Sequence, residues 1–397
     1  MNPLSLSRFA ERLVAARPEL QEELDRAAHG QWTADSMRSF LKSQDLGGEF
    51  ALPSVLRRLR QRVMLRVLAR DLGGIAGLDE VCGAMSALAE VSIATALEAL
   101  QPGLEEELGV PFAAGGRQTL LVVGMGKLGG GELNVSSDVD LVFVYPEEGE
   151  TRGRRPVSNH EFFDRLGRKL IKALDEATEE GRVFRVDMRL RPWGDAGPLA
   201  TSFDALEHYL VTQGREWERY AWIKARALTG DRADALSAIV QPFVFRKYLD
   251  YGAFAAVREM HAQIRAEVAR REMSDHIQLG PGGIREIEFI AQAFQLIRGG
   301  RDPSLQLRPT VGVLALLAGS RKPSPPNWDS AAETFSSRHS GASACRCGSR
   351  VENTSSKWRD TRSRWASSAG ANACHEGNPI AWATSARSPS FAGSLCV

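Results

Sequence analysis

The stretch Gly124-Met-Gly-Lys-Leu-Gly-Gly-Gly-Glu-Leu-Asn-Val-Ser-Ser-Asp138-Val-Asp140-Leu-Val-Phe-Val144 contains the residues that decide the fold. A short apolar run, residues 119–123, enters the glycine cluster, and a second apolar run leaves it after Asp140. Short apolar runs bounded by glycines are typical of buried strands. The pattern therefore predicts a strand, a tight glycine-rich turn, and a second strand over residues 139–145 that opens with Asp-x-Asp.

Two common phosphate-binding motifs resemble this turn but do not fit it. The spacing Gly-x-Gly-x-x-Gly from Gly124 matches a dinucleotide-binding fingerprint, which requires a crossover helix in a unit of about 30 residues. Only residues 131–138 separate the cluster from the next predicted strand, which leaves no room for such a helix. The phosphate loop of nucleotide hydrolases requires Ser or Thr after its lysine, and here Leu128 follows Lys127.

The two aspartates at the start of the second strand are predicted to bind a metal ion. Side chains alternate along a strand, so Asp138 and Asp140 project from one face. Two adjacent carboxylates repel each other unless a cation neutralises them, and Mg²⁺ takes oxygen ligands while leaving positions for substrate phosphates. The alternative is a surface turn in which Asp138 caps a backbone group and Asp140 faces solvent. The glycine turn and the apolar residues 141–144 favour the metal site.

A third carboxylate is predicted on a neighbouring strand over residues 183–190. Apolar residues alternate along this run, which places four charged residues together on its opposite face: Arg185, Asp187, Arg189 and Arg191. One acid among three arginines suits a surface that binds metal and phosphate. The alternative is an ordinary exposed strand face with paired charges. We expect Asp187 to complete the metal site begun by Asp138 and Asp140.

The rest of the first 318 residues is predicted to be mostly helical, by the spacing of apolar residues. Helical runs are expected over residues 56–72, 81–100, 159–179, 251–272 and 284–297, the second of them ending before Gln-Pro-Gly. The fold class is α+β, mostly helical, with a small mixed sheet between helical domains. We expect four regions: residues 1–115 (helical), 116–200 (the core with the glycine-rich turn and Asp-x-Asp), 201–318 (helical) and 319–397 (a tail).

Composition and charge argue against several classes of protein. With 50 basic and 49 acidic residues, the net charge of +1 gives no overall positive field for nucleic acid. No run of 18 apolar residues predicts a membrane span, and early charges interrupt any signal-peptide core. We therefore expect a cytoplasmic protein without a nucleic-acid or membrane partner. Only Cys82 precedes residue 320, which leaves the body without a disulfide framework or a cysteine-based metal site.

The tail differs from the body in composition. Residues 321–397 contain four Val, Leu or Ile residues, four of the eight tryptophans and sixteen serines. So few aliphatic residues cannot bury enough apolar surface to offset the entropy lost on ordering, which predicts disorder. A natural disordered tail is one interpretation, and out-of-frame translation explains the Trp and Cys content better. A zinc site formed by Cys345, Cys347, Cys374 and His375 is disfavoured by this composition.

Four long motifs together resemble the glutamine synthetase adenylyltransferase/adenylyl-removing enzymes of the DNA polymerase beta-like nucleotidyltransferase superfamily. The first is the glycine turn with its Asp-x-Asp. The others are Val186-Asp-Met-Arg-Leu-Arg-Pro-Trp-Gly-Asp-Ala-Gly-Pro-Leu199, Gln213-Gly-Arg-Glu-Trp-Glu-Arg-Tyr-Ala-Trp-Ile-Lys-Ala-Arg226 and Leu279-Gly-Pro-Gly-Gly-Ile-Arg-Glu-Ile-Glu-Phe-Ile-Ala-Gln292. The resemblance starts near residue 55 and fades near residue 318. It therefore predicts a truncated chain with a non-native tail.

The resemblance also implies a reaction. The family carries two such domains, one that removes AMP from a tyrosine of glutamine synthetase by phosphorolysis and one that attaches AMP from ATP. The forms Gly-Arg-Glu-Trp-Glu-Arg-Tyr and Gly-Gly-Ile-Arg-Glu-Ile-Glu resemble the first, so we expect ADP and active glutamine synthetase as products, in the control of nitrogen assimilation. The alternatives are forward transfer from ATP, transfer to another acceptor, or a non-catalytic remnant that only binds partners.

By resemblance, the catalytic and metal-binding acids are Asp138, Asp140 and Asp187, with Mg²⁺ as the cofactor. The expected partners are glutamine synthetase, phosphate and ADP or ATP, with a PII-type signalling protein as a further candidate. Glycines let backbone N–H groups approach a phosphate, and arginines grip oxyanions with two hydrogen bonds. The residues predicted to bind the nucleotide or phosphate are Gly126, Lys127, Gly129, Gly130, Ser137, Arg189 and Arg191.

Two further charged segments are weaker candidates. A predicted helix over residues 215–226 carries a stripe that could contact substrate or form ion pairs: Arg215, Arg219, Trp222 and Arg226. Glu286 opens another helix, where it could be catalytic or simply favoured by the helix dipole.

Overall fold

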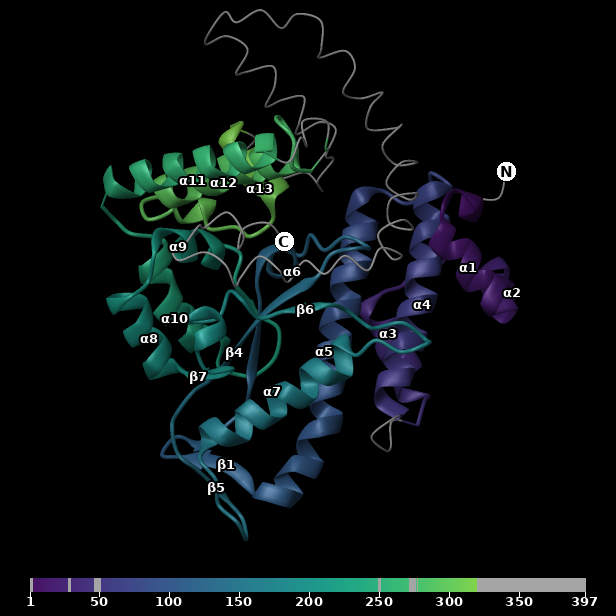
Figure 1. Ribbon diagram of the computed structural model, residues 1–397, viewed down its shortest axis with the longest axis horizontal. Helices are drawn as coiled ribbons and strands as arrows, with labels where there is room; N and C mark the ends of the chain where they lie inside the picture. The colour runs from purple at the N-terminus through teal and green to yellow at the C-terminus, as the bar shows by residue number, and fades with distance from the viewer. Residues whose placement is uncertain are drawn as a thin grey trace, which may run out of the picture.

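The computed structural model describes residues 3–27, 30–45, 51–248, 251–270, 276 and 278–319 (Figure 1). Helices precede and follow a small mixed sheet, which confirms the mostly helical α+β class. The predictions of a disordered, out-of-frame tail and of its zinc alternative fall on residues that, apart from Gly319, lie outside the described part of the chain.

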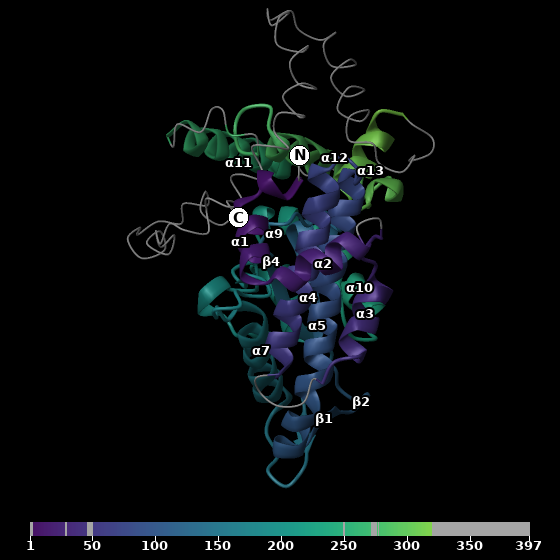
Figure 2. The same cartoon turned by 90° about the vertical axis from the view of Figure 1, so that its right-hand side faces the viewer.

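Helices fill the part of the chain before the sheet. They are η1 (Pro3–Leu6), α1 (Arg8–Ala16), α2 (Pro18–Ala27), α3 (Ala34–Lys42), α4 (Ala51–Leu72) and α5 (Leu78–Leu108). Ser7 caps α1 by accepting a hydrogen bond from the backbone N–H of Ala10, and Thr33 and Ser36 form a capping box at α3. The long helices α4 and α5 lie side by side in both views (Figures 1 and 2).

Helix α5 corrects one prediction, because it does not end before Pro102. It continues to Leu108, and Leu104 and Leu108 extend its buried stripe by another turn. Pro102 is on the exposed side, where the carbonyl group that it leaves without a partner can bond to water. By length and composition alone, α5 could cross a membrane, but most of its apolar window is buried inside the fold.

Five short strands form the central sheet. They are β3 (Leu121–Gly124), β4 (Val139–Tyr145), β6 (Val186–Asp187), β7 (Ala200–Ser202) and β8 (Arg226–Ala227). β3 lies between β8 and β4 and is antiparallel to both, whereas β6 and β7 pair with β4 in parallel. The strands predicted before and after the glycine turn are confirmed. The strand predicted over residues 183–190 shrinks to β6, because the chain turns after Asp187.

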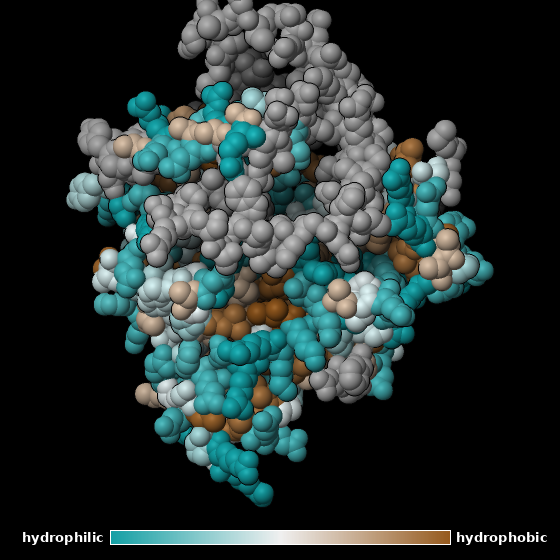
Figure 3. All heavy atoms as spheres, viewed as in Figure 1, coloured by the Kyte–Doolittle hydropathy of each residue, from teal (hydrophilic) through white to brown (hydrophobic). Residues whose placement is uncertain are grey.

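A second, three-stranded sheet and one long helix lie at the lower end of Figure 1. The sheet has the order β2 (Gly116–Arg117), β1 (Val110–Ala113), β5 (Glu150–Arg152). The helix is α7 (Asn159–Asp175), which ends four residues before the predicted residue 179 and is capped by Ser158. From the same viewpoint, polar side chains cover most of the described surface, and apolar ones gather near the middle of this face (Figure 3).

The central sheet is covered on both faces, as the alternation of its side chains requires. Val122, Leu141 and Phe143 face a core shared with α3, α4, α5 and α7. Val123 and Val142 face a second core built by helices that follow the sheet. These helices are α8 (Phe203–Thr212), α9 (Glu216–Trp222), α10 (Ala233–Val244), α11 (Tyr251–Arg270) and α12 (Ile284–Arg298).

The last described elements extend this helical layer. They are η3 (Pro303–Leu305) and α13 (Thr310–Leu317), and α13 packs beside α12 (Figure 1). The predicted helices over residues 251–272 and 284–297 are confirmed within two residues of α11 and α12. Strands β7 and β8 belong to the sheet although they reach past the expected boundary at residue 200. The division into four regions stays a prediction.

Candidate active site

The structure brings two of the predicted acids together at one edge of the sheet. β4 and β6 run parallel with Asp140 directly opposite Asp187, so both side chains project from the same face. Asp138 precedes β4 by one residue, and the Val139 N–H donates to the carbonyl of Arg185. The predicted pairing of Asp-x-Asp with an acid on a neighbouring strand is therefore present in the fold.

The glycine turn lies against this edge. The N–H of Met125 donates to the carbonyl of Asp140 at 2.9 Å and fixes the start of the turn to β4. Gly126 has φ of +50°, and a Cβ atom there would lie 3.1 Å from Oδ2 of Asp140. A side chain at Gly126 would thus be strained and would crowd the carboxylate, so glycine keeps the approach to Asp140 open.

The electrostatics of Asp140 fit a cation at this edge. Burial and, after it, the negative charges of Asp187 and Asp138 raise the pKa of Asp140 from 3.8 to about 7, against the opposing effects of Lys127 and Arg189. The opposing effects of Lys127 and Arg189 do not cancel this rise. Hard carboxylate oxygens are donors that Mg²⁺ takes.

Two of the acids nevertheless have arginine partners. Arg185 pairs with Asp138 through Nε, and Arg189 Nε lies 3.0 and 2.9 Å from the two carboxylate oxygens of Asp187. Within the described residues, no three His, Cys, Asp or Glu side chains gather closely enough to form a complete metal site. The assignment of Asp138, Asp140 and Asp187 as metal ligands stays a prediction, with Asp140 and Asp187 as its central pair.

Lys127 and Ser137 lie on the same side of the turn. Nζ of Lys127 is 3.5 Å from Oγ of Ser137. Burial lowers the pKa of Lys127, as do the nearby cations Lys224 and Arg285, whereas Glu288 and Asp140 raise it. Lys127 therefore lies between the carboxylate edge and the start of α12. This position suits the predicted contact with a substrate phosphate.

Gly129 packs against protein backbone, and Gly130 lies close to two side chains. A Cβ atom at Gly129 would collide with the carbonyl oxygens of Lys224 and Gly124, and the Gly129 N–H already donates to Met125 O at 3.0 Å. A Cβ atom at Gly130 would lie 3.0 Å from Oε2 of Glu132 and 3.4 Å from Cδ of Lys224. These two glycines let the turn dock against the segments that follow the sheet. Their predicted contact with phosphate stays a prediction.

Arg191 does not share the strand face with Asp187, so that part of the prediction is wrong. The chain turns after β6, with the Arg191 N–H donating to Met188 O at 3.2 Å. The Arg191 side chain points into this turn, where Nη1 donates to Met188 O at 2.8 Å and to Asp195 at 3.3 Å. Arg189, by contrast, stays on the face of Asp187. A phosphate contact by Arg191 stays a prediction.

The two weaker candidates have structural partners. Arg219 is buried in α9 and donates to the carbonyls of Val244 and Leu296, and Arg226 donates to the carbonyl of Gly129. Glu286 accepts from the Gly282 N–H at 2.7 Å and pairs with His261 at 3.4 Å. Arg219 also pairs with Glu216 at 3.1 Å and Arg226 with Glu90 at 2.5 Å, which favours the ion-paired interpretation of the arginine stripe over direct contact with substrate.

A buried polar network behind the glycine turn was missed by the sequence analysis. Lys224 places Nζ 2.7 Å from Glu132, 3.2 Å from Glu288 and 3.0 Å from Thr310 Oγ1. Glu132 also accepts from the Thr310 N–H at 2.6 Å. The four residues come from the end of the turn, the segment after α9, α12 and α13. They tie the glycine turn to the last described helices.

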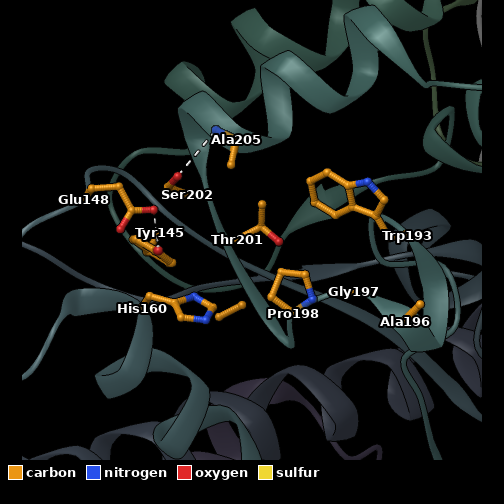
Figure 4. A pocket seen from close by; sticks show the side chains of 11 residues that line it. Tyr145, Glu148, His160, Trp193, Ala196, Gly197, Pro198, Thr201, Ser202 and Ala205 are labelled. Carbon is orange, nitrogen blue, oxygen red and sulfur yellow. Dashed lines mark hydrogen bonds between the residues drawn. The ribbon is translucent and has the colours of Figure 1, made fainter.

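A pocket of about 380 Å³ lies at the far end of β4 from Asp140 (Figure 4). Tyr145, the last residue of β4, donates its O–H to Glu148 at 2.7 Å there. Trp193 forms part of the rim and has φ of +60°, a left-handed conformation unusual for a tryptophan. Its indole N–H donates to Gln213 at 3.0 Å. The sequence analysis did not predict this pocket.

Comparisons with known proteins place the chain in a family. The family model described as glutamate-ammonia ligase adenylyltransferase matches residues 1–239, more than half of the chain. The chain belongs to this family. A second model, described as GlnD PII-uridylyltransferase, matches residues 258–322, the region of α11 to α13. The resemblance inferred from the motifs is confirmed, and the family is one of nucleotidyltransferase enzymes.

Relatives in this family are each named bifunctional glutamine synthetase adenylyltransferase/adenylyl-removing enzyme. One from Chromobacterium violaceum is 57% identical over 317 residues, covering 79% of this chain and 35% of the relative. Others from Aromatoleum aromaticum and Nitrosomonas eutropha are 56% identical over 314 and 326 residues, again over 79% of this chain and 33% and 35% of the relatives. The chain therefore spans about a third of the length of these relatives.

Proposed function

We propose that this chain removes AMP from an adenylylated tyrosine of glutamine synthetase by metal-dependent phosphorolysis, releasing ADP and the unmodified enzyme. The observation that carries the proposal is the in-register pair Asp140 and Asp187 beside the glycine turn, with the pKa of Asp140 raised to about 7 by burial and by its acidic neighbours. Family membership supports the protein substrate, since relatives are named for adenylylation of glutamine synthetase and its removal.

The direction of the reaction rests on two motifs. Gly-Arg-Glu-Trp-Glu-Arg-Tyr leads into α9, and Gly-Gly-Ile-Arg-Glu-Ile-Glu opens α12. Both resemble the forms found in the deadenylylating domain of the family. In this chain, Arg219 of the first motif donates to the carbonyl of Val244, and Glu286 of the second accepts from the Gly282 N–H.

The residues present fit a divalent cation, and Mg²⁺ is the ion we propose. Asp140 and Asp187 would hold it, with Asp138 as the third acid. When bound, such an ion neutralises the carboxylates and stabilises negative charge on phosphoryl oxygens. The fit is carried by the chemistry of the donor set: Asp140 lies opposite Asp187, and its pKa is raised by burial and by the charges of Asp187 and Asp138.

The protein side chains bind and orient the phosphoryl groups in this reaction. An oxygen of monohydrogen phosphate forms a bond to the α-phosphorus, and the bond from that phosphorus to the tyrosine oxygen breaks. The phenolic oxygen keeps the electron pair and takes up the proton released by the phosphate. Lys127 and Arg189 lie beside Asp140 and Asp187, where their charges would bind the phosphoryl oxygens.

A direct assay tests this function. The full chain is incubated with adenylylated glutamine synthetase, Mg²⁺ and phosphate, and in parallel with unmodified glutamine synthetase, Mg²⁺ and ATP. We expect ADP to form only in the first reaction and only when phosphate is present. Labelling of glutamine synthetase from ATP would instead assign the forward transfer to this chain. If the folded protein catalyses neither reaction, the result supports the alternative of a non-catalytic remnant that only binds partners.

We also propose that a PII-type signalling protein contacts the region of α11 to α13. The similarity of residues 258–322 to a PII-uridylyltransferase supports this partner. Co-elution of the chain with a purified PII-type protein would test it, and unchanged elution of both would contradict it. A cytoplasmic location, suggested by the composition, stays a prediction.

A further inference from the structure

Helix α4 carries six arginines, and five of them lie against a carboxylate. Arg57 pairs with Glu176 at 4.0 Å, and Arg58 acts electrostatically on Glu180. The remaining three pair with acids on α2 and α5: Arg62 and Arg66 with Glu23, and Arg70 with Glu80. A buried or half-buried guanidinium group is stable only when its charge is compensated, so this pairing is what the fold requires.

Arg60 is the exception on this helix. Its guanidinium carbon lies 5.6 Å from the ring centroid of Phe184. Its Nε is buried without a hydrogen-bond partner, as are those of Arg57, Arg58 and Arg66, but these three have an acid nearby. Within the described part of the chain, no carboxylate forms an ion pair with it. The contact with Phe184 places Arg60 beside the segment that carries Arg182 and Arg185, whereas its neighbours on α4 lie near acids. Burial and these two cations together lower the pKa of Arg60 to about 10.

Arg182 and Arg185 do not compensate the positive charge of Arg60. Arg182 pairs with Asp175 at 2.9 Å, and Arg185 pairs with Asp138 and donates to the carbonyl of Ser136 at 3.2 Å. Each therefore brings one positive charge and one acid, and the charge of Arg60 stays uncompensated. The cluster also lies at the margin of the proposed site, because Arg185 contacts Asp138 directly.

We propose that Arg60, Arg182 and Arg185 form the binding site for inorganic phosphate, the attacking group of the proposed phosphorolysis. The inference rests on that proposed function for the role of the phosphate. A tetrahedral oxyanion accepts several hydrogen bonds at once from planar guanidinium groups, and it supplies the negative charge that Arg60 lacks. The same group becomes the β-phosphate of ADP after it bonds to the α-phosphorus, so the site would also hold the end of the product.

The position of the cluster separates its role from that of Lys127 and Arg189. Those two cations act on the pKa of Asp140 and lie at the carboxylate pair. Arg60 comes from α4 and lies against Phe184, in the segment that carries Arg182 and Arg185. The nucleophile would therefore be held by one group of cations and the phosphoryl group under attack by another.

Binding of inorganic phosphate to the full chain tests the site without any reaction. Thermal unfolding is measured against phosphate concentration in EDTA, with chloride added to keep the ionic strength constant. We expect phosphate to raise the Tm of the wild-type protein, and Arg60→Gln to require about 10- to 100-fold more phosphate for the same rise. Arg62→Gln is the matched control, because Arg62 lies on the same helix and pairs with Glu23 at 2.9 Å.

Steady-state kinetics give a second readout. Arg60→Gln should raise the KM for phosphate by the same factor and leave the KM for adenylylated glutamine synthetase unchanged. Equal phosphate dependence of the Arg60→Gln and wild-type proteins, in unfolding and in KM, would overturn the proposal. If the glutamine variant does not fold, Arg60→Lys takes its place: it keeps the charge but loses the paired hydrogen bonds, and wild-type phosphate binding in it would also overturn the proposal.

These experiments distinguish an error in the anion site from an error in the proposed reaction. If phosphate binding depends on Arg60 but no AMP is released from glutamine synthetase, the anion site stands and the proposed reaction is wrong. If phosphate-dependent release of ADP is observed with a normal KM for phosphate in Arg60→Gln, the reaction stands and the anion site is wrong. Stabilisation by ATP or ADP but not by inorganic phosphate would place a nucleotide phosphate there and would also contradict the assignment.

Discussion

Replacing Asp140 with asparagine should remove activity and stabilise the metal-free fold. Asp140 has a pKa of about 7 in the folded protein against 3.8 as its usual value, because it is buried beside Asp187 and Asp138. The folded protein therefore holds a proton on Asp140 between about pH 4 and 7 that the unfolded chain has released. Stability falls as the pH rises through this window, and the whole loss is present above pH 7.

The size of this effect follows from the two pKa values. At about 1.4 kcal/mol per pH unit, the difference between 3.8 and about 7 corresponds to about 4 kcal/mol. Asp140 is only half-buried, and water at the rim of the site screens its charge, so we expect Asp140→Asn to gain about 2 kcal/mol at pH 8. At pH 4 the wild-type carboxyl group is protonated in the folded state, and the two proteins should be equally stable.

The assay is urea unfolding in EDTA at pH 8 and at pH 4. Asp204→Asn is the matched control: Asp204 is exposed at the start of α8, and its replacement should change stability by less than about 1 kcal/mol at either pH. Mg²⁺ should then stabilise the wild-type protein more than Asp140→Asn, because the variant lacks a charged ligand. An Asp140→Asn protein that is no more stable than wild type at pH 8 would refute the raised pKa of Asp140.

Three further predictions concern the stability of the fold. Lys224→Met leaves Glu132 and Glu288 without their shared cation and should lower the free energy of unfolding by about 3 kcal/mol in urea, whereas the exposed Lys247→Met should have little effect. Gly129→Ala should cost about 1–3 kcal/mol and reduce activity, because its methyl group would meet the Lys224 carbonyl. Gly83→Ala, in open space within α5, should instead gain about 0.5–1 kcal/mol.

The sequence predicted the turn and its strands because their signals are local. Glycines bounded by apolar runs predicted β3 and β4, and Asp140 lies at the start of β4, as expected. The acid on a neighbouring strand was also predicted correctly, because Asp187 lies between alternating apolar residues. These features depend on a few consecutive residues, so one sequence is sufficient to identify them.

Features that depend on distant contacts were beyond the reach of the sequence. Pro102 looks like the end of a helix, but the burial of Leu104 and Leu108 extends α5 beyond it. Arg191 continues the alternation that places Asp187, yet a turn carries it away from the strand face. In the sequence, Arg60 resembles the other arginines of α4. In the fold it lies against Phe184, in the segment after α7 that carries Arg182 and Arg185. In each case the competing contact comes from another element.

The glycine turn is held from two sides, and this arrangement makes the site sensitive to the helices that follow the sheet. On one side, the Met125 N–H is held by the carbonyl of Asp140. On the other side, Glu132 at the end of the turn binds Lys224, which follows α9, and Thr310, the first residue of α13. A displacement of α12 or α13 would therefore be transmitted through Glu132 to the turn that lies against Asp140. A partner bound to these helices would have a direct physical route to the carboxylates.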